Sequence, residues 1–131
     1  MVKFIRNNIL SIIVAIGIAV VSFMSPGDIN KINIFKLHNV DRLVHAVMYF
    51  VLALTLCYEN RVRLLKVTNY IYLSIIPILF GLFIEILQPV VTKGRSAELI
   101  DEVFNIAGTV VAFFIWYIFR HRKTTSQYNL L

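Results

Sequence analysis

Charged residues are scarce in this sequence. Asp, Glu, Lys and Arg together make up 15% of its 131 residues, whereas ordinary globular domains contain roughly 25%. Apolar residues make up 59%, and the mean hydropathy is +0.78. Water cannot solvate that much apolar surface on so short a chain, but a lipid bilayer can. The composition therefore argues against a soluble domain and indicates a membrane protein.

Cysteine, repeats and linkers are also nearly absent. Cys57 is the single cysteine, so an intrachain disulfide is excluded. No internal repeat, low-complexity tract or long linker divides the chain, which predicts one domain over residues 1–131.

The net charge of +6 comes from Lys and Arg residues that lie between the apolar runs rather than in a basic domain. Such charges are typical of the flanks of membrane spans, and we expect no nucleic-acid partner.

Four apolar runs are long enough to suggest membrane crossings. A hydrocarbon core of about 30 Å needs roughly 20 helical residues. The runs predict spans at about residues 4–24, 43–58, 70–91 and 97–119. No small-residue cleavage pattern follows the first run, so we expect a retained span rather than a signal peptide. The predicted fold class is an all-α integral membrane protein with four transmembrane helices in a small bundle, followed by a flexible tail at residues 120–131.

The distribution of Lys and Arg predicts the orientation. The N-terminus, the second connection and the C-terminal tail carry eight of these residues, and the first and third connections carry five. Because cytoplasmic segments are enriched in Lys and Arg, both termini are expected in the cytoplasm. The predicted location is the cell membrane, with multiple crossings.

Polar residues inside the runs fall into three groups. Residues three or four positions apart share one face of a helix. By that spacing, the groups are Asp41, His45 and Tyr49; Gly81, Glu85 and Gln88; and Glu98, Asp101, Asn105 and Gly108. The second and fourth predicted helices enter the membrane from the side through which the third leaves. All three groups are therefore expected at the same membrane end.

Two interpretations of this polar end compete. Interhelical hydrogen bonds could fasten the bundle, but each contributes only about 0.6–2 kcal/mol, and one would suffice where seven polar groups are present. The alternative is a pocket at the outer leaflet that binds a polar head group, because ionisable residues inside a membrane are expensive and usually functional. The predicted pocket consists of Asp41, Arg42, His45, Tyr49, Glu85, Gln88, Arg95, Asp101 and Asn105.

Metal and catalytic chemistry have weaker support. Asp41, His45, Glu85 and Asp101 have suitable ligand atoms, but no tight motif such as H-E-x-x-H is present. We therefore predict no metal and no cofactor. Glu85 or Asp101 as a base, with His45 as an acid, are the candidates for catalysis, without an assigned reaction. A small transporter would place its carboxylate nearer the midplane, and no inverted repeat is visible.

The polar groups also carry a family resemblance. The stretch from Asp41 to Tyr49 resembles the D-[KR]-x-x-H-x-x-x-Y opening of VanZ-like membrane proteins. The stretch from Gly81 to Gln88 resembles their G-x-x-x-E-x-x-Q segment, and Gly94 to Gly108 resembles their G-R-x…D-x-x-x-N-x-x-G segment. The order and spacing are intact as far as about Phe119. Ala112 stands where a further Gly is common in the family, and Thr92-Lys93 replaces a Pro-rich approach to the G-R pair.

The resemblance implies a multi-pass bacterial cell-membrane protein with a link to teicoplanin resistance. It supplies no reaction, because the activity of the family is not settled. The expected partners are membrane lipids and either a lipid-linked wall precursor or a lipoglycopeptide. The alternative function is a membrane enzyme that acts on a lipid-linked cell-envelope substrate.

Overall fold

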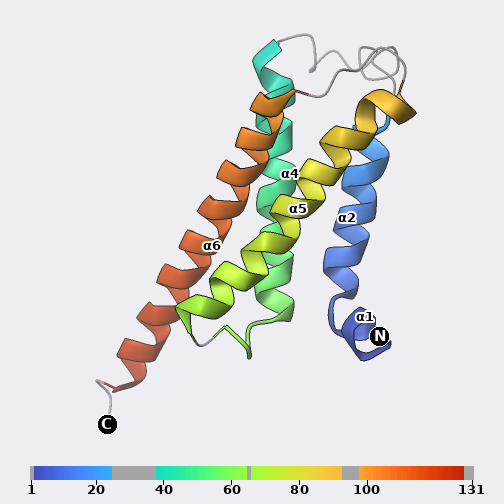
Figure 1. Ribbon diagram of the computed structural model, residues 1–131. Helices are drawn as coiled ribbons and strands as arrows, with labels where there is room; N and C mark the ends of the chain where they lie inside the picture. Colours follow the sequence, from blue (N-terminus) through green and yellow to red (C-terminus); the bar gives the residue numbers. More distant parts are fainter. Residues whose placement is uncertain (1, 25–37, 65, 93–97, 129–131) are drawn as a thin grey trace.

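The computed structural model describes residues 2–24, 38–64, 66–92 and 98–128, and every regular element within these ranges is a helix. These elements are α1 (Val2–Asn7), α2 (Ile9–Ser22), α4 (His38–Glu59), α5 (Val67–Val91) and α6 (Leu99–Tyr128) (Figure 1). The predicted all-α class is confirmed.

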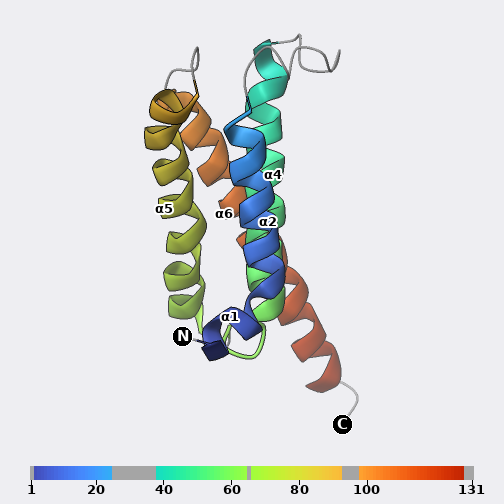
Figure 2. The same ribbon diagram turned by 90° about the vertical axis from the view of Figure 1, so that its right-hand side faces the viewer.

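Helix α4 lies at the centre of the bundle. It packs against α2, α5 and α6, and its contact with α6 is the most extensive (Figures 1 and 2). Gly108 of α6 makes that contact possible, because a Cβ atom at this position would lie 2.0 Å from the carbonyl oxygen of Ala46. Ala53 and Ala112 are also fully buried. Small residues allow helix backbones to approach closely, as in membrane helix pairs.

Three helical segments among the described residues are long and apolar enough to cross a membrane. They are Asp41–Glu59, Val67–Val91 and Leu99–Arg120, with 19, 25 and 22 residues. Large apolar side chains on their outer faces, such as Ile71, Leu79 and Phe114, are exposed. An apolar exterior of this kind is unfavourable in water and is compatible with a membrane-embedded protein.

The first predicted span differs from a single transmembrane helix. The run 4–24 is interrupted at Asn8, where the backbone leaves helical geometry at φ −130° and ψ 32°. Helix α2 then has 14 residues, which extend over about 21 Å at roughly 1.5 Å per residue. That length is short of the roughly 30 Å hydrocarbon core. By length and composition, the described helices therefore include three candidate spans, and the fourth predicted span is not confirmed.

The last helix is longer than its predicted span. Helix α6 continues to Tyr128, so the backbone is helical through most of the segment 120–131, for which the sequence predicts a flexible tail. The flexibility of that segment and its cytoplasmic location stay predictions.

Two apolar clusters hold the helices together. One contains Ile18 of α2 with Tyr49, Leu52 and Leu56 of α4. The other joins α4, α5 and α6 around Tyr70, whose ring stands nearly perpendicular to those of Phe113 and Tyr117, at interplanar angles of 78° and 84°. Edge-to-face aromatic pairs contribute about 0.5–1.5 kcal/mol beyond the area that they bury.

Candidate functional site

The three polar groups come together at one end of the bundle. The first turns of α4 and α6 and the last turns of α5 lie at this end, which is uppermost in Figure 1. His45, Glu85, Asp101 and Asn105 are all buried there. Because α4 and α6 run opposite to α5, residues from the beginning of two helices and the end of the third reach the same depth.

His45 is the centre of this polar cluster. Its Nδ1 atom lies 3.2 Å from Asn105 Oδ1, and Asn105 Nδ2 donates to Glu102 Oε2 at 3.0 Å. Since the amide nitrogen of Asn105 faces a carboxylate, its oxygen must face the imidazole and can only accept. The neutral His45 ring therefore carries its proton on Nδ1, which leaves the Nε2 lone pair available to a bound group or ion.

Glu85 approaches the same imidazole from α5. Its Oε1 atom lies 3.9 Å from His45 Nδ1, and both side chains are almost fully buried. The two residues form an ion pair when the imidazole is protonated. Charged groups inside a membrane protein normally face a partner or a polar cavity, and this contact keeps the Glu85 carboxylate within the cluster.

Gly81 makes room for the inner side of the cluster. A Cβ atom at Gly81 would lie 2.6 Å from Glu102 Oε2, 3.1 Å from Asn105 Nδ2 and 3.2 Å from the Tyr49 ring. The Tyr49 hydroxyl and Glu102 Oε1 are buried, with no hydrogen-bond partner among the residues that the structure describes. Leaving a buried polar group unsatisfied costs about 1–3 kcal/mol. These two oxygen atoms are therefore suited to hydrogen-bond a group that enters the site.

A possible metal-ligand set lies on the outer side of His45. One ligand atom from each of Asp41, His45 and Asp101 falls within 4.8 Å of the other two. Carboxylate oxygen and imidazole nitrogen suit divalent cations such as Zn²⁺ and Mn²⁺. The sequence predicts no metal because these three residues form no contiguous motif. The fold brings the third ligand from a different helix.

Two other predicted pocket residues, Arg42 and Gln88, lie outside this cluster. Arg42 is at the rim, 3.9 Å from Glu98, where both side chains are partly exposed. Gln88 donates from Nε2 to the carbonyl oxygen of Ser22 at 2.9 Å, which ties α5 to the C-terminal end of α2. Arg95 lies outside the described residues.

Glu102 is a site residue that the sequence analysis does not assign. It lies three positions before Asn105 and is buried against it. The i, i+3 spacing places both residues on one helix face and could have indicated this. In the sequence Glu102 resembles a membrane-flanking acid, whereas in the structure α5 approaches it closely at Gly81.

Comparisons with known proteins give no relative for this chain. No protein-family model matches it, and no curated protein or solved structure matches it.

Proposed function

We propose that this chain is a VanZ-like cell-membrane protein whose polar cluster binds the head group of an amphiphilic cell-envelope molecule. The observation that carries the proposal is the convergence of His45, Glu85, Glu102 and Asn105 at one buried end of the bundle. Lipoglycopeptide antibiotics such as teicoplanin and lipid-linked wall components are the candidate ligands, because each joins a polar head to a hydrocarbon tail.

The chemistry of the cluster favours ligand binding over simple fastening of helices. If the cluster served only to hold helices together, its buried oxygen atoms would be hydrogen-bonded to neighbouring helices. The Tyr49 hydroxyl and Glu102 Oε1, however, have no hydrogen-bond partner among the described residues. The carboxylates of Glu85 and Asp101 add further acceptors. The preferred head group therefore presents hydroxyl, amine or amide donors. Arg42 at the rim is placed to meet a phosphate or carboxylate.

The membrane arrangement is part of the proposal. Helix α2 runs alongside α4 over much of its length (Figures 1 and 2), and its outward residues Ile13, Ile16 and Val20 are exposed and apolar. We propose that α2 is a short fourth crossing, with the bilayer thinned around it. The excess of Lys and Arg then orients both termini toward the cytoplasm and the polar cluster toward the outer leaflet.

Growth in the presence of teicoplanin tests the resistance function. Cells that carry the wild-type gene should tolerate more antibiotic than cells without it, and Glu85→Gln should abolish the difference. Thr68→Ala is the control, because Thr68 is exposed and distant from the cluster in sequence and along α5. Equal susceptibility of all four strains, at equal protein levels in the membrane fraction, would refute the link to teicoplanin.

The metal-ligand geometry supports a second candidate, a metal-dependent membrane hydrolase for a lipid-linked substrate. In this function Asp41, His45 and Asp101 hold the ion, and Glu85 is a candidate general base. Metal analysis of the purified protein and of Asp101→Asn, with lipid analysis of a deletion strain, distinguishes the two functions. Stoichiometric metal that Asp101→Asn loses, together with an accumulated lipid-linked compound, favours the hydrolase.

A further inference from the structure

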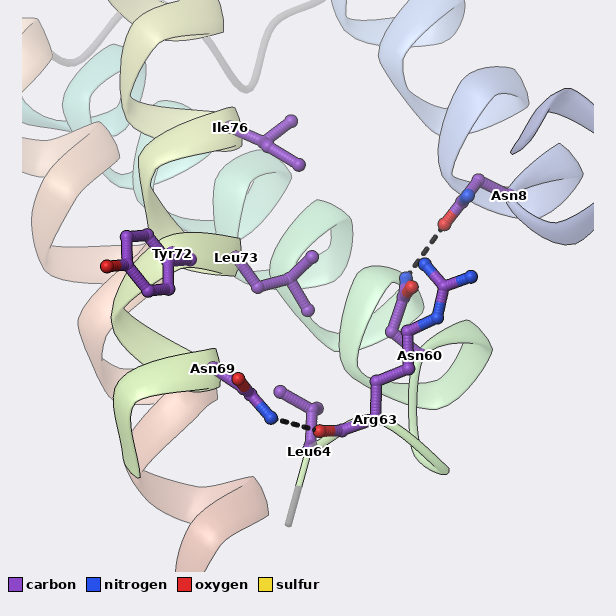
Figure 3. A pocket seen from close by; sticks show the side chains of 8 residues that line it. All are labelled: Asn8, Asn60, Arg63, Leu64, Asn69, Tyr72, Leu73 and Ile76. Carbon is purple, nitrogen blue, oxygen red and sulfur yellow. Dashed lines mark hydrogen bonds between the residues drawn. The ribbon is translucent and has the colours of Figure 1, made fainter. Parts of the chain in front are cut away.

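A second polar feature lies at the opposite end of the bundle. A cavity of about 310 Å³ opens between the start of α2, the end of α4 and the first turns of α5 (Figure 3). The residues that define its character are Asn8, Asn60, Arg63, Asn69, Leu73 and Ile76. None of them belongs to the polar cluster around His45, so this cleft, which we call the Arg63 cleft, is a separate site.

Hydrogen bonds fix the polar wall of the Arg63 cleft. Asn60 Nδ2 donates to Asn8 Oδ1 at 2.8 Å and to the Leu56 carbonyl oxygen at 3.0 Å. Asn69 Nδ2 donates to the Arg63 carbonyl oxygen. These hydrogen bonds join the start of α2 to the end of α4, and the start of α5 to the segment that connects α4 and α5. The wall is pre-formed, which lowers the entropic cost of binding.

Arg63 provides an uncompensated positive charge in this wall. Its guanidinium forms no ion pair or hydrogen bond with the residues that the structure describes, and it extends toward Asn60 and Asn8 (Figure 3). The nearby carboxylate of Glu59 instead accepts hydrogen bonds from the backbone of Leu10 and Ser11. Guanidinium groups bind phosphate in a bidentate manner, so an anion fits this position.

The opposite wall of the Arg63 cleft is apolar. Leu73 and Ile76 lie on successive turns of α5 and project into the cleft (Figure 3). A ligand that satisfies both walls must carry an anionic group beside a hydrocarbon chain. The volume is at the lower end of the roughly 300–1,000 Å³ typical of small-molecule sites. It accommodates a head group and the beginning of one chain rather than a whole lipid.

We propose that the Arg63 cleft binds an anionic phospholipid of the leaflet that surrounds this end of the bundle. The phosphate contacts Arg63, and the first part of an acyl chain lies along Leu73 and Ile76. Arg6 of α1, Lys66 before α5 and Arg120, which bonds to the Arg61 carbonyl oxygen, flank the same end and favour anionic over zwitterionic lipids. This leaflet is the cytoplasmic one in the orientation proposed above. Binding of a lipid in the Arg63 cleft does not depend on which ligand binds the polar cluster around His45.

Native mass spectrometry of the purified full-length protein tests this site with two arginine variants. Wild type should retain phosphatidylglycerol in preference to phosphatidylcholine, and Arg63→Gln should weaken phosphatidylglycerol binding about tenfold. Arg61→Gln is the matched control, because the Arg61 side chain is already bonded to the Tyr58 carbonyl and stacked 4.7 Å from the Tyr58 ring centroid. Equal losses in both variants would show general attraction to charge and overturn the site.

A second pair of variants tests the apolar wall. Ile75 and Ile76 are equally exposed, at 43% each, but only Ile76 lines the cleft. Ile76→Trp should block phosphatidylglycerol retention, and Ile75→Trp should leave it unchanged. Protection of the buried Cys57 thiol from labelling verifies folding. Wild-type retention by folded Ile76→Trp would overturn the proposal, and if that variant does not fold, the arginine pair decides.

Two further measurements separate this proposal from others. Glycerol phosphate that binds as tightly as phosphatidylglycerol would identify a soluble phosphate as the ligand and overturn the lipid assignment. Glu85→Gln should retain phosphatidylglycerol like wild type, because it alters only the polar cluster. Loss of lipid binding in Glu85→Gln would contradict two independent sites, whereas loss of teicoplanin tolerance alone concerns only the proposed function.

Discussion

Two glycine residues show how the surroundings of a position determine whether a larger side chain fits there. At Gly108 an added Cβ would lie 2.0 Å from the Ala46 carbonyl oxygen and 2.9 Å from its carbonyl carbon. A backbone atom cannot rotate away, so α4 and α6 would have to separate. At Gly17, on the exposed face of α2, the added atom would have nothing within 4 Å apart from its chain neighbours and the local backbone of its own helix.

We predict opposite effects for alanine at these positions. Gly108→Ala should destabilise the protein by about 2–3 kcal/mol through overpacking. Gly17→Ala should be neutral or stabilising by up to about 1 kcal/mol, because alanine is the better helix former. The reactivity of Cys57, which is fully buried between α4 and its neighbours, reports unfolding on heating in detergent. Equal transition temperatures for the two variants would contradict the close helix approach.

The tautomer of His45 is a second prediction at the residue scale. The orientation of Asn105, set by Glu102, requires the proton on Nδ1 of the neutral ring. In ¹⁵N NMR spectra the His45 signals, assigned by their loss in His45→Gln, should show protonated Nδ1 and unprotonated Nε2. Asn105→Leu should remove this preference, and Thr68→Ala should preserve it. A wild-type ring protonated on Nε2 would refute the hydrogen-bond chain.

Residue spacing predicted part of the polar cluster and missed the rest for physical reasons. His45, Glu85 and Asn105 stand out in a sequence because ionisable and amide groups are rare in apolar runs. Glu102 does not, because it lies near a helix end, where acids are ordinary. Gln88 was predicted for the pocket, yet it bonds to α2. The side of a helix that α2 covers is a tertiary property, which helical periodicity alone does not specify.

At the scale of elements, the N-terminus of α2 is held by the C-terminus of α4. The Glu59 carboxylate accepts hydrogen bonds from the backbone of Leu10 at 2.7 Å and Ser11 at 3.1 Å, and from the Ser11 hydroxyl at 2.5 Å. The first amide groups of a helix lack partners within the helix. A negative charge there satisfies these donors and also interacts favourably with the helix dipole.

Glu59→Gln should therefore loosen the start of α2. The substitution removes the charge and one set of acceptor lone pairs, at a cost of about 1–2 kcal/mol. Hydrogen–deuterium exchange should become faster at the first amides of α2 and remain unchanged in α6. Glu98→Gln is the control, because the Glu98 carboxylate makes a long, partly exposed contact with Arg42 and lies at the opposite end of the bundle. Unchanged exchange in Glu59→Gln would show that packing alone orders this helix end.

Helix boundaries were predicted well where hydropathy determines them and poorly where a distant partner does. The predicted spans 70–91 and 97–119 agree with most of α5 and with the first two thirds of α6. The interruption at Asn8 was missed, because the residue that bonds its side chain, Asn60, is 52 positions away. Hydropathy predicts whether a helix lies in lipid or in water, whereas the interruption of the helix at Asn8 depends on a polar contact at the edge of the bundle.

At the scale of the whole molecule, charge and exposed apolar surface define two different ends and a middle. Apolar side chains cover the outside of the helices. The His45 cluster, rich in acids and amides, occupies one end, and the Arg63 cleft with its neighbouring arginines occupies the other. Such polarity along the helix axis is what the positive-inside rule uses to set orientation. It also means that the two proposed ligands approach from opposite leaflets.

Whether α2 crosses the membrane decides on which side the N-terminus lies. Figure 1 shows α1 at the same end of the bundle as the junction of α4 and α5. In this structure Asn8 is bonded to Asn60, so if α2 crosses, Asn7 and Val62 are on one side and Leu99 is on the other. Asn7 and Val62 on opposite sides would require three crossings and a different position for α2. All three residues are exposed, and Cys57 is buried, so single cysteines can be introduced without removing the native one.

We predict that a membrane-impermeant maleimide added to intact cells labels Leu99→Cys and leaves Asn7→Cys and Val62→Cys unlabelled. All three should react after permeabilisation, whereas wild type should not. Labelling of Asn7→Cys and Val62→Cys without Leu99→Cys would keep four crossings but invert the orientation, and would move the His45 cluster to the cytoplasmic leaflet. Labelling of Asn7→Cys but not Val62→Cys would mean three crossings and would contradict the hydrogen bond between Asn8 and Asn60, which holds the start of α2 beside the end of α4.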